Sequence, residues 1–201
     1  MAKLDLDHLN QEYFDVLREI GNIGTGNATT ALSKMLDCKV DMYVPQVRLL
    51  DFSEVGTVIG GEELLMAGIY LGVQGDISGS ILFMLEVSSA QKLIRILLGD
   101  DSDESHLSEM EESALKEIGN IITASYLNSL STLTGLSILP TVPALSIDMA
   151  GAILSVPAIV YGTMADKLLM IQTQFFDGLN GYFFLAPDLE SYEKILSSLG
   201  M

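Results

Sequence analysis

The feature that most constrains this chain is a pentapeptide that occurs twice. Glu-Ile-Gly-Asn-Ile occupies residues 19–23 and recurs at 117–121, 98 residues further along a chain of 201. The same offset relates other short matches, among them Leu-Ser at 32–33 and 130–131 and Val-Pro at 44–45 and 142–143. Self-similarity at a fixed period is typical of a duplicated structural unit. We therefore expect one domain over residues 1–201, built from two repeats of about 10–99 and 108–200.

Each half predicts the same series of elements: a long helix, three strands and a short helix. The first long helix is expected from Asn10 to about Leu36, and Ser108 with Glu111 forms a capping-box pattern that starts its counterpart. Strand-like segments separated by turn-forming residues follow at 40–50, 64–73 and 80–85, and at 138–147, 167–175 and 182–185. Short amphipathic helices over 89–98 and 189–199 complete the halves.

The halves are expected to share one sheet, because three strands alone cannot hide a sheet face. Hydrophobic residues make up 49% of the chain, which is enough for a sizeable core. The predicted fold is α+β, a three-layer α/β sandwich with a continuous, mainly antiparallel, six-stranded sheet. A pseudo-twofold axis would relate the two repeats, and the long helices would carry the repeated residues.

The charge of the chain excludes several classes of partner. With 27 acidic against 10 basic residues, the formal net charge is −17, which repels nucleic acid and anionic membrane surfaces. The longest apolar stretch, residues 64–73, is about half of the roughly 20 residues that a membrane-spanning helix needs. The first residues are acidic, unlike the basic start of a signal peptide. We therefore expect a cytoplasmic protein with a protein partner, no nucleic acid and no membrane insertion.

The residues needed for a self-contained hydrolase or a metal site do not occur in the right pattern. Cys38 is the one cysteine, and the two histidines, His8 and His106, have no second imidazole or thiol at a ligand spacing. No serine or cysteine nucleophile is paired with a histidine, and no phosphate-binding glycine loop follows a strand. We expect no metal bound by this chain itself.

A polar stripe runs along each long helix. Asp15, Glu19 and Asn22 are spaced i, i+4 and i+7, which places their side chains within an arc of roughly 60°. Leu17 and Ile20 lie on the opposite side, which we expect to face the sheet. The second long helix repeats the stripe with Ser113, Glu117 and Asn120. The stripe is therefore expected to face solvent or a partner.

Identity of the glutamate and asparagine in both halves indicates a function, although an exposed pair in a single copy would indicate only a solvated face. Asparagine is a poor residue for a helix interior, so helix propensity does not explain it. Glycines within a helix are also unfavourable. Gly24 is expected to allow close packing inside the chain, whereas Gly21 and Gly119 could let a partner's backbone approach.

A glutamate beside an asparagine can complete the active site of another protein. A carboxamide can orient a water by donating and accepting hydrogen bonds, as the glutamine of small GTPases does, when the phosphoryl group and metal belong to a bound partner. A carboxylate can pair with a lysine of that partner and fix its orientation. The pattern therefore favours action on a docked phosphoprotein.

These residues resemble the motif of the CheC/CheX/FliY family of chemotaxis phosphatases, in which Asp or Ser, Glu and Asn on a helix are followed by a proline. The first copy comprises Asp15, Glu19, Asn22 and Pro45, and the second comprises Ser113, Glu117, Asn120 and Pro143, with 22 residues between asparagine and proline in each. The resemblance covers essentially the whole chain. Two intact motifs in a short chain, without an added flagellar-switch domain, favour the CheC-like members.

The resemblance implies hydrolysis of the aspartyl phosphate of CheY, with Mg²⁺ supplied by CheY. Asn22 and Asn120 would position the attacking water, and Glu19 and Glu117 would bind a CheY lysine.

The remaining motif residues would have supporting roles. Asp15 and Ser113 would assist the glutamates, and Pro45 and Pro143 would shape the strand after each helix, although prolines at a strand edge need no function. Members of the family also bind CheD, a receptor-modifying deamidase, and Asp148 is the residue where we expect such a contact.

Two alternatives remain open. The chain could be a non-catalytic docking or adaptor protein of the chemotaxis or flagellar-switch apparatus. It could also be another hydrolase that uses Glu19 and Glu117 as an acid and base pair. The repeat disfavours the second alternative, because matching surroundings would not give two carboxylates the different pKa values that these roles require.

Overall fold

The computed structural model describes residues 11–99, 107–161, 167–175 and 179–200. The predicted helix start at Asn10, together with His8 and His106, lies outside these ranges. The first half contains α1 (Gln11–Leu36), β1 (Met42–Asp51), α2 (Phe52–Val58), β2 (Leu65–Gly75), β3 (Gly79–Glu86) and α3 (Val87–Leu98). The second half contains α4 (Glu109–Thr134), β4 (Ile138–Pro140), β5 (Ala144–Met149), α5 (Ala150–Tyr161), β6 (Lys167–Phe175), β7 (Leu179–Pro187) and α6 (Leu189–Ser198).

The strands form one antiparallel sheet in the order β1-β6-β7-β3-β2-β4, and β5 also pairs with β2. β3 and β7 meet at the centre, and the first strand of each half pairs with the second strand of the other half. Exchanging the halves leaves this order unchanged, as a duplicated unit would require. The continuous sheet is confirmed, with one difference: the described strands number seven because the edge strand of the second half is divided into β4 and β5.

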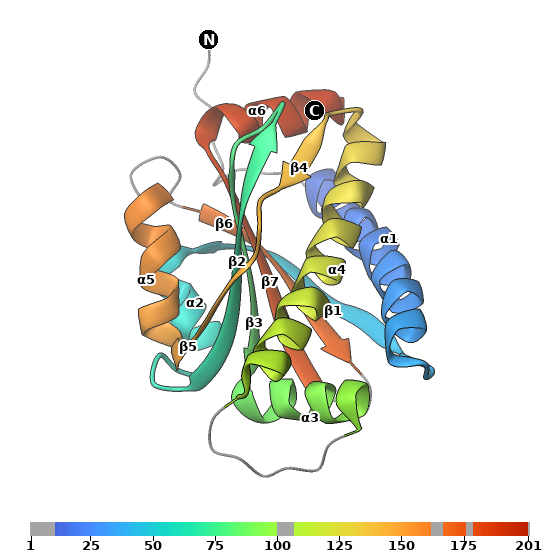
Figure 1. Cartoon of the computed structure of the whole chain (residues 1–201). Helices are drawn as coiled ribbons and strands as arrows, with labels where there is room; N and C mark the ends of the chain where they lie inside the picture. Colours follow the sequence, from blue (N-terminus) through green and yellow to red (C-terminus); the bar gives the residue numbers. More distant parts are fainter. Residues whose placement is uncertain (1–10, 100–106, 162–166, 176–178, 201) are drawn as a thin grey trace.

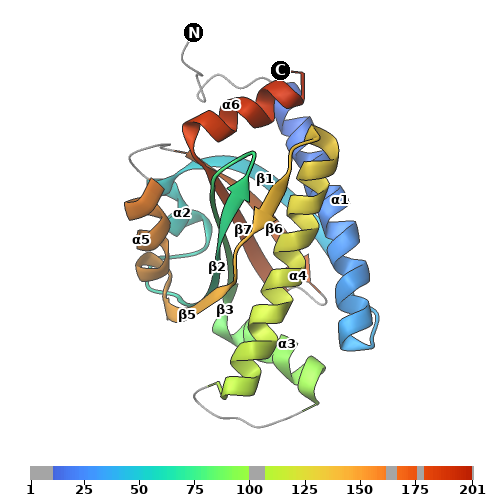
Figure 2. The ribbon, with the colours of Figure 1, turned by 45° about the horizontal axis from the view of Figure 1, so that its top comes forward.

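Helices cover both faces of the sheet, as the predicted three-layer arrangement requires (Figure 1). α1 and α4 lie side by side on one face, and α2 and α5 lie on the other, while α3 and α6 lie at opposite ends (Figures 1 and 2). Central strands supply side chains to both layers: Phe83 belongs to the core beneath α1 and α4, and Leu82 and Met84 belong to the core beneath α2 and α5.

The helices α2 and α5 were not predicted, so each half has one more helix than expected. Both cover a sheet face that would otherwise expose apolar residues such as Met66, Met84 and Phe184. α2 contains only seven residues, but Asp51 and Glu54 form a capping box at its start. The sequence therefore contains a helix-start signal for α2, which the prediction of strands over 40–50 and 64–73 did not use.

The start of α4 and the packing of α1 agree with what their sequences predict. At the start of α4, Ser108 N donates to Glu111 Oε2 at 2.7 Å and Glu111 N donates to Ser108 Oγ at 3.3 Å, which confirms the predicted capping box. Gly135, in the left-handed conformation at φ 72°, ends the helix. A methyl group at Gly24 would overlap the Tyr126 ring, so the predicted packing role of Gly24 is also confirmed.

Candidate functional site

The polar stripe of α1 lies on the exposed side of the helix. Asp15, Glu19 and Asn22 are all exposed, and Asp15 forms an ion pair of 3.5 Å with Arg18. On the opposite side Leu17 and Ile20 are buried, as expected. The carboxylate of Glu19 and the carboxamide of Asn22 therefore occupy one accessible face, one helical turn apart.

The second copy has a similar arrangement on α4. Ser113 and Glu117 are exposed and Asn120 is half-buried, while Ile118 and Ile122 of the same helix are buried. Because α1 and α4 pack side by side (Figure 2), the two Glu-x-x-Asn pairs are carried by neighbouring helices of one layer. Neither pair is enclosed in the core, so both can meet a docked macromolecule.

The expectation that glycines of the motif admit a partner is wrong for Gly119. A methyl group there would overlap the side chain of Ile69 in β2, so this glycine allows α4 to approach the sheet. Gly119 is two residues from Glu117, which places it about 200° around the helix and on the core side. Gly21 is buried as well, which leaves little surface for a partner's backbone at that residue.

The two motif prolines occur where the edge strands are interrupted. The pairing of β1 with β6 shifts between Tyr43 and Gln46, the segment that contains Pro45, whose side chain lies outside the described residues. Pro143 is half-buried in the break between β4 and β5. Proline has no N–H to donate to a ladder, so interruptions of edge strands are the positions that tolerate it.

A buried polar bridge behind the α1 motif was missed by the sequence analysis. The Tyr126 hydroxyl of α4 is 2.8 Å from Thr25 Oγ1 and 2.9 Å from Thr173 Oγ1 of β6. Burial raises the pKa of Tyr126, and the hydrogen bonds to Thr173 and Thr25 partly oppose this rise. The bridge joins both long helices to the sheet one turn after Asn22.

The second half lacks this bridge. Ala28 stands at the position equivalent to Tyr126, and Thr123 stands at the position equivalent to Thr25. Thr123 is fully buried, and its hydroxyl has no hydrogen-bond partner among the described residues. The only sequence signal for this difference was the change from alanine to tyrosine between the halves.

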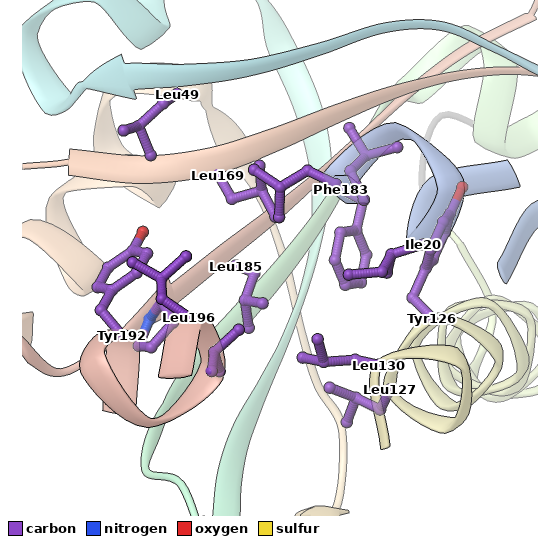
Figure 3. A pocket seen from close by; sticks show the side chains of 14 residues that line it. Ile20, Leu49, Tyr126, Leu127, Leu130, Leu169, Phe183, Leu185, Tyr192 and Leu196 are labelled. Atoms are coloured by element: carbon purple, nitrogen blue, oxygen red, sulfur yellow. The ribbon is translucent and has the colours of Figure 1, made fainter. Parts of the chain in front are cut away.

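An apolar cavity lies between the sheet and the helices α1, α4 and α6, as Figure 3 shows. Ile20, Leu127 and Leu130 approach it from the long helices, and Phe183 and Tyr192 line it as well. An apolar pocket is the usual first candidate for a ligand site. This cavity is on the core side of α1, away from Glu19 and Asn22, and its apolar lining offers no chemistry for phosphoryl transfer.

The chemistry of the exposed pairs is limited to positioning and pairing. Within the described ranges, no three His, Cys, Asp or Glu side chains gather as a possible metal site. A carboxylate and a carboxamide on an accessible helix face can bind a lysine and orient a water on a docked protein.

No helix in the described part of the chain is both long and apolar enough to span a membrane.

Asp148 lies apart from these pairs, on β5 at the edge of the sheet. Its side chain is exposed, and its Oδ1 accepts a hydrogen bond of 2.7 Å from Met149 N. In the ladder it pairs with Met66 of β2. A partner bound at Asp148 would therefore contact the sheet edge.

Comparison with known proteins yields consistent matches. A family model described as the CheC-like family matches residues 14–48 and 110–147. The CheY-P phosphatase CheC of Bacillus subtilis is 38% identical over 200 residues, which are 96% of each chain. The crystal structure of Thermotoga maritima FliY has a TM-score of 0.70 at 21% identity and covers 96% of this chain and 98% of that one. A chain of the CheX-CheY-BeF3-Mg²⁺ complex of Borrelia burgdorferi has a TM-score of 0.54 at 20% identity, covering 85% and 96%. At these identities the two structures show a shared fold.

Proposed function

Because this chain belongs to the CheC-like family, we propose that it is a phosphatase that hydrolyses the aspartyl phosphate of the response regulator CheY. The relative from Bacillus subtilis, which is named a CheY-P phosphatase, aligns over nearly the whole of both chains. The observation that carries the proposal is the pair of accessible Glu-x-x-Asn sites on the neighbouring helices α1 and α4.

Each site would complete the active site of the docked regulator. Asn22 or Asn120 donates to and accepts from a water, which attacks phosphorus as the bond to the aspartyl oxygen breaks, releasing the carboxylate and inorganic phosphate. Mg²⁺ bound by the regulator would supply neutralisation of charge on the phosphoryl oxygens. Holding the water in line with the phosphorus atom makes its attack a step within one complex, which is faster than attack by an unoriented water from solution.

The glutamates would fix the orientation of the regulator. Glu19 and Glu117 are exposed and can each pair with the lysine beside the acyl phosphate. Asp15 and Ser113, one turn earlier, would support this contact. The net charge of −17 favours approach of the basic side chain of a partner.

Two further parts of the proposal concern organisation and partners. The matching motifs and the symmetric strand order support a gene duplication that produced two sites in one domain. The exposed Asp148 at the sheet edge is the proposed contact for CheD. With a role in chemotaxis signalling, the protein would act in the cytoplasm.

The direct test is the decay of phosphorylated CheY with and without this protein. We expect faster decay, and substitution of both Glu19 and Glu117 by alanine should weaken the effect about as much as substitution of both asparagines. Unchanged decay in the presence of the wild-type protein would reject the phosphatase. Hydrolysis of glycosides or small esters without a phosphoprotein would instead support the acid and base alternative.

A further inference from the structure

Asn22 lies at an open hollow on the molecular surface. Its lining consists of Asn22, Thr25, Gly26 and Thr29 of α1 with Met42 and Tyr43 at the start of β1. Tyr43 has 54% of its surface exposed, although tyrosine supplies a large apolar ring. Exposed tyrosines of this kind are enriched at protein interfaces. The hollow is thus continuous with the site proposed above.

Gly26 gives an independent reason to regard the hollow as a docking surface. It is exposed within α1, where glycine is less favourable than alanine. A methyl group at Gly24 would overlap Tyr126, but one at Gly26 would meet nothing within 4 Å. Packing inside the chain therefore explains Gly24 and leaves Gly26 unexplained. The open space at Gly26 would let atoms of a partner approach the helix beside Asn22.

The equivalent surface beside Asn120 is built differently. Ala124 stands in place of Gly26, and Leu127, which is buried, stands in place of Thr29. Thr141 stands in place of Tyr43, and its hydroxyl accepts a hydrogen bond of 2.8 Å from Gly72 N. The side chain of Thr141 is therefore tied to β2, whereas the ring of Tyr43 remains exposed.

We propose that the hollow beside Asn22, to which Gly26 and Tyr43 contribute, is a docking subsite for phosphorylated CheY. This subsite belongs to the α1 site alone. This inference rests on the proposed function. The six lining residues are uncharged, so the hollow offers no ion-pair partner to a charged side chain. The exposed ring of Tyr43 provides an aromatic surface. The occupant is therefore an apolar or aromatic side chain of the regulator that packs on this ring next to the phosphoaspartate, while the regulator's lysine pairs with Glu19. The two sites then bind the same regulator through different contacts.

The test uses full-length protein carrying Asn120→Ala, in which only the α1 site retains its asparagine. Gly26→Ala and Tyr43→Thr each introduce the residue found at the matching position of the second half. In this background Tyr43→Thr should raise the KM for phosphorylated CheY about tenfold and Gly26→Ala about threefold, with kcat changed less than twofold. Gly26→Ala should also raise the melting temperature by about 1–4 °C, so its higher KM cannot result from unfolding.

The matched control places the same substitutions in the Asn22→Ala background, where turnover occurs at the α4 site and KM should change less than about twofold. An unchanged KM in an active Asn120→Ala protein would overturn the subsite while leaving the phosphatase intact. An equal rise of KM in both backgrounds, or an inactive Asn120→Ala protein beside an active wild type, would also overturn it. If wild-type protein does not accelerate decay, the proposed function fails with it.

Discussion

Replacing Thr25 and Thr123 separately by valine should change the stability of the protein in opposite directions. The two threonines occupy equivalent positions, 98 residues apart, and both are buried in a long helix. Thr25 Oγ1 bonds with the Tyr126 hydroxyl at 2.8 Å, whereas Thr123 Oγ1 has no partner within the described part of the chain. Threonine and valine have similar helix propensities, so the hydroxyl group decides the result.

The magnitudes follow from the cost of hydrogen bonds and of unpaired polar groups. Thr25→Val loses a net contribution of about 1 kcal/mol and leaves the Tyr126 hydroxyl with Thr173 as a partner, so the total cost is about 1–2 kcal/mol. Thr123→Val removes a buried hydroxyl without a partner and should stabilise the fold by about 1 kcal/mol. With a urea m-value of roughly 2.5 kcal/mol/M, the midpoint falls by about 0.4–0.8 M for Thr25→Val and rises by about 0.4 M for Thr123→Val.

Urea unfolding followed by circular dichroism measures both shifts, and Tyr126→Phe is the matched control because it removes the same bridge from the other helix. A double-mutant cycle of Thr25→Val with Tyr126→Phe should give a coupling energy of about 1 kcal/mol. Midpoints that move in the same direction for the two threonines, or a vanishing coupling energy, would refute this reasoning.

Two other predictions concern packing and pH. Gly24→Ala should destabilise the protein by about 1–3 kcal/mol, because the added methyl group displaces the Tyr126 ring. Thermal unfolding measures this loss. A melting temperature equal to that of the wild type would contradict the prediction and show that α1 and α4 can move apart without cost. Stability should also fall as the pH rises above about 10: burial raises the pKa of Tyr126 and Tyr192, so the unfolded chain loses these protons first. Urea melts from pH 8 to 11 should show this fall, and Tyr126→Phe should make it shallower; an identical slope in the variant would contradict the assignment to Tyr126.

The sequence predicted the long helices and their exposed stripes because identical polar residues recur at one helical spacing in both halves. It also predicted the shared sheet, since neither half has enough strands for a covered face. Helix α5 was missed because its apolar sequence, with Pro157 inside it, has no polar face to reveal the helical period. The predicted single strand over 138–147 is divided into β4 and β5. This division depends on how the edge strand pairs along β2, which strand propensity does not specify.

Within the candidate site, comparison of the halves identified what they share and overlooked what differs. The bridge through Tyr126 occurs once, because alanine, Ala28, stands at the equivalent position of the first half. A search for repeated residues therefore could not find it. Gly119 was misjudged although the helical spacing already placed it away from Glu117. The hollow beside Asn22 depends on where β1 begins relative to α1, which is a tertiary relation that the sequence pattern does not contain.

The most direct measurement compares turnover with binding when Asn22 and Asn120 are both replaced by alanine. Decay of phosphorylated CheY reports turnover, and titration with beryllofluoride-activated CheY reports binding. The acceleration of decay should fall about 100-fold or more because no carboxamide positions the water, while Kd changes less than about threefold. A variant that still accelerates decay as the wild type does would contradict the proposed role of the two asparagines.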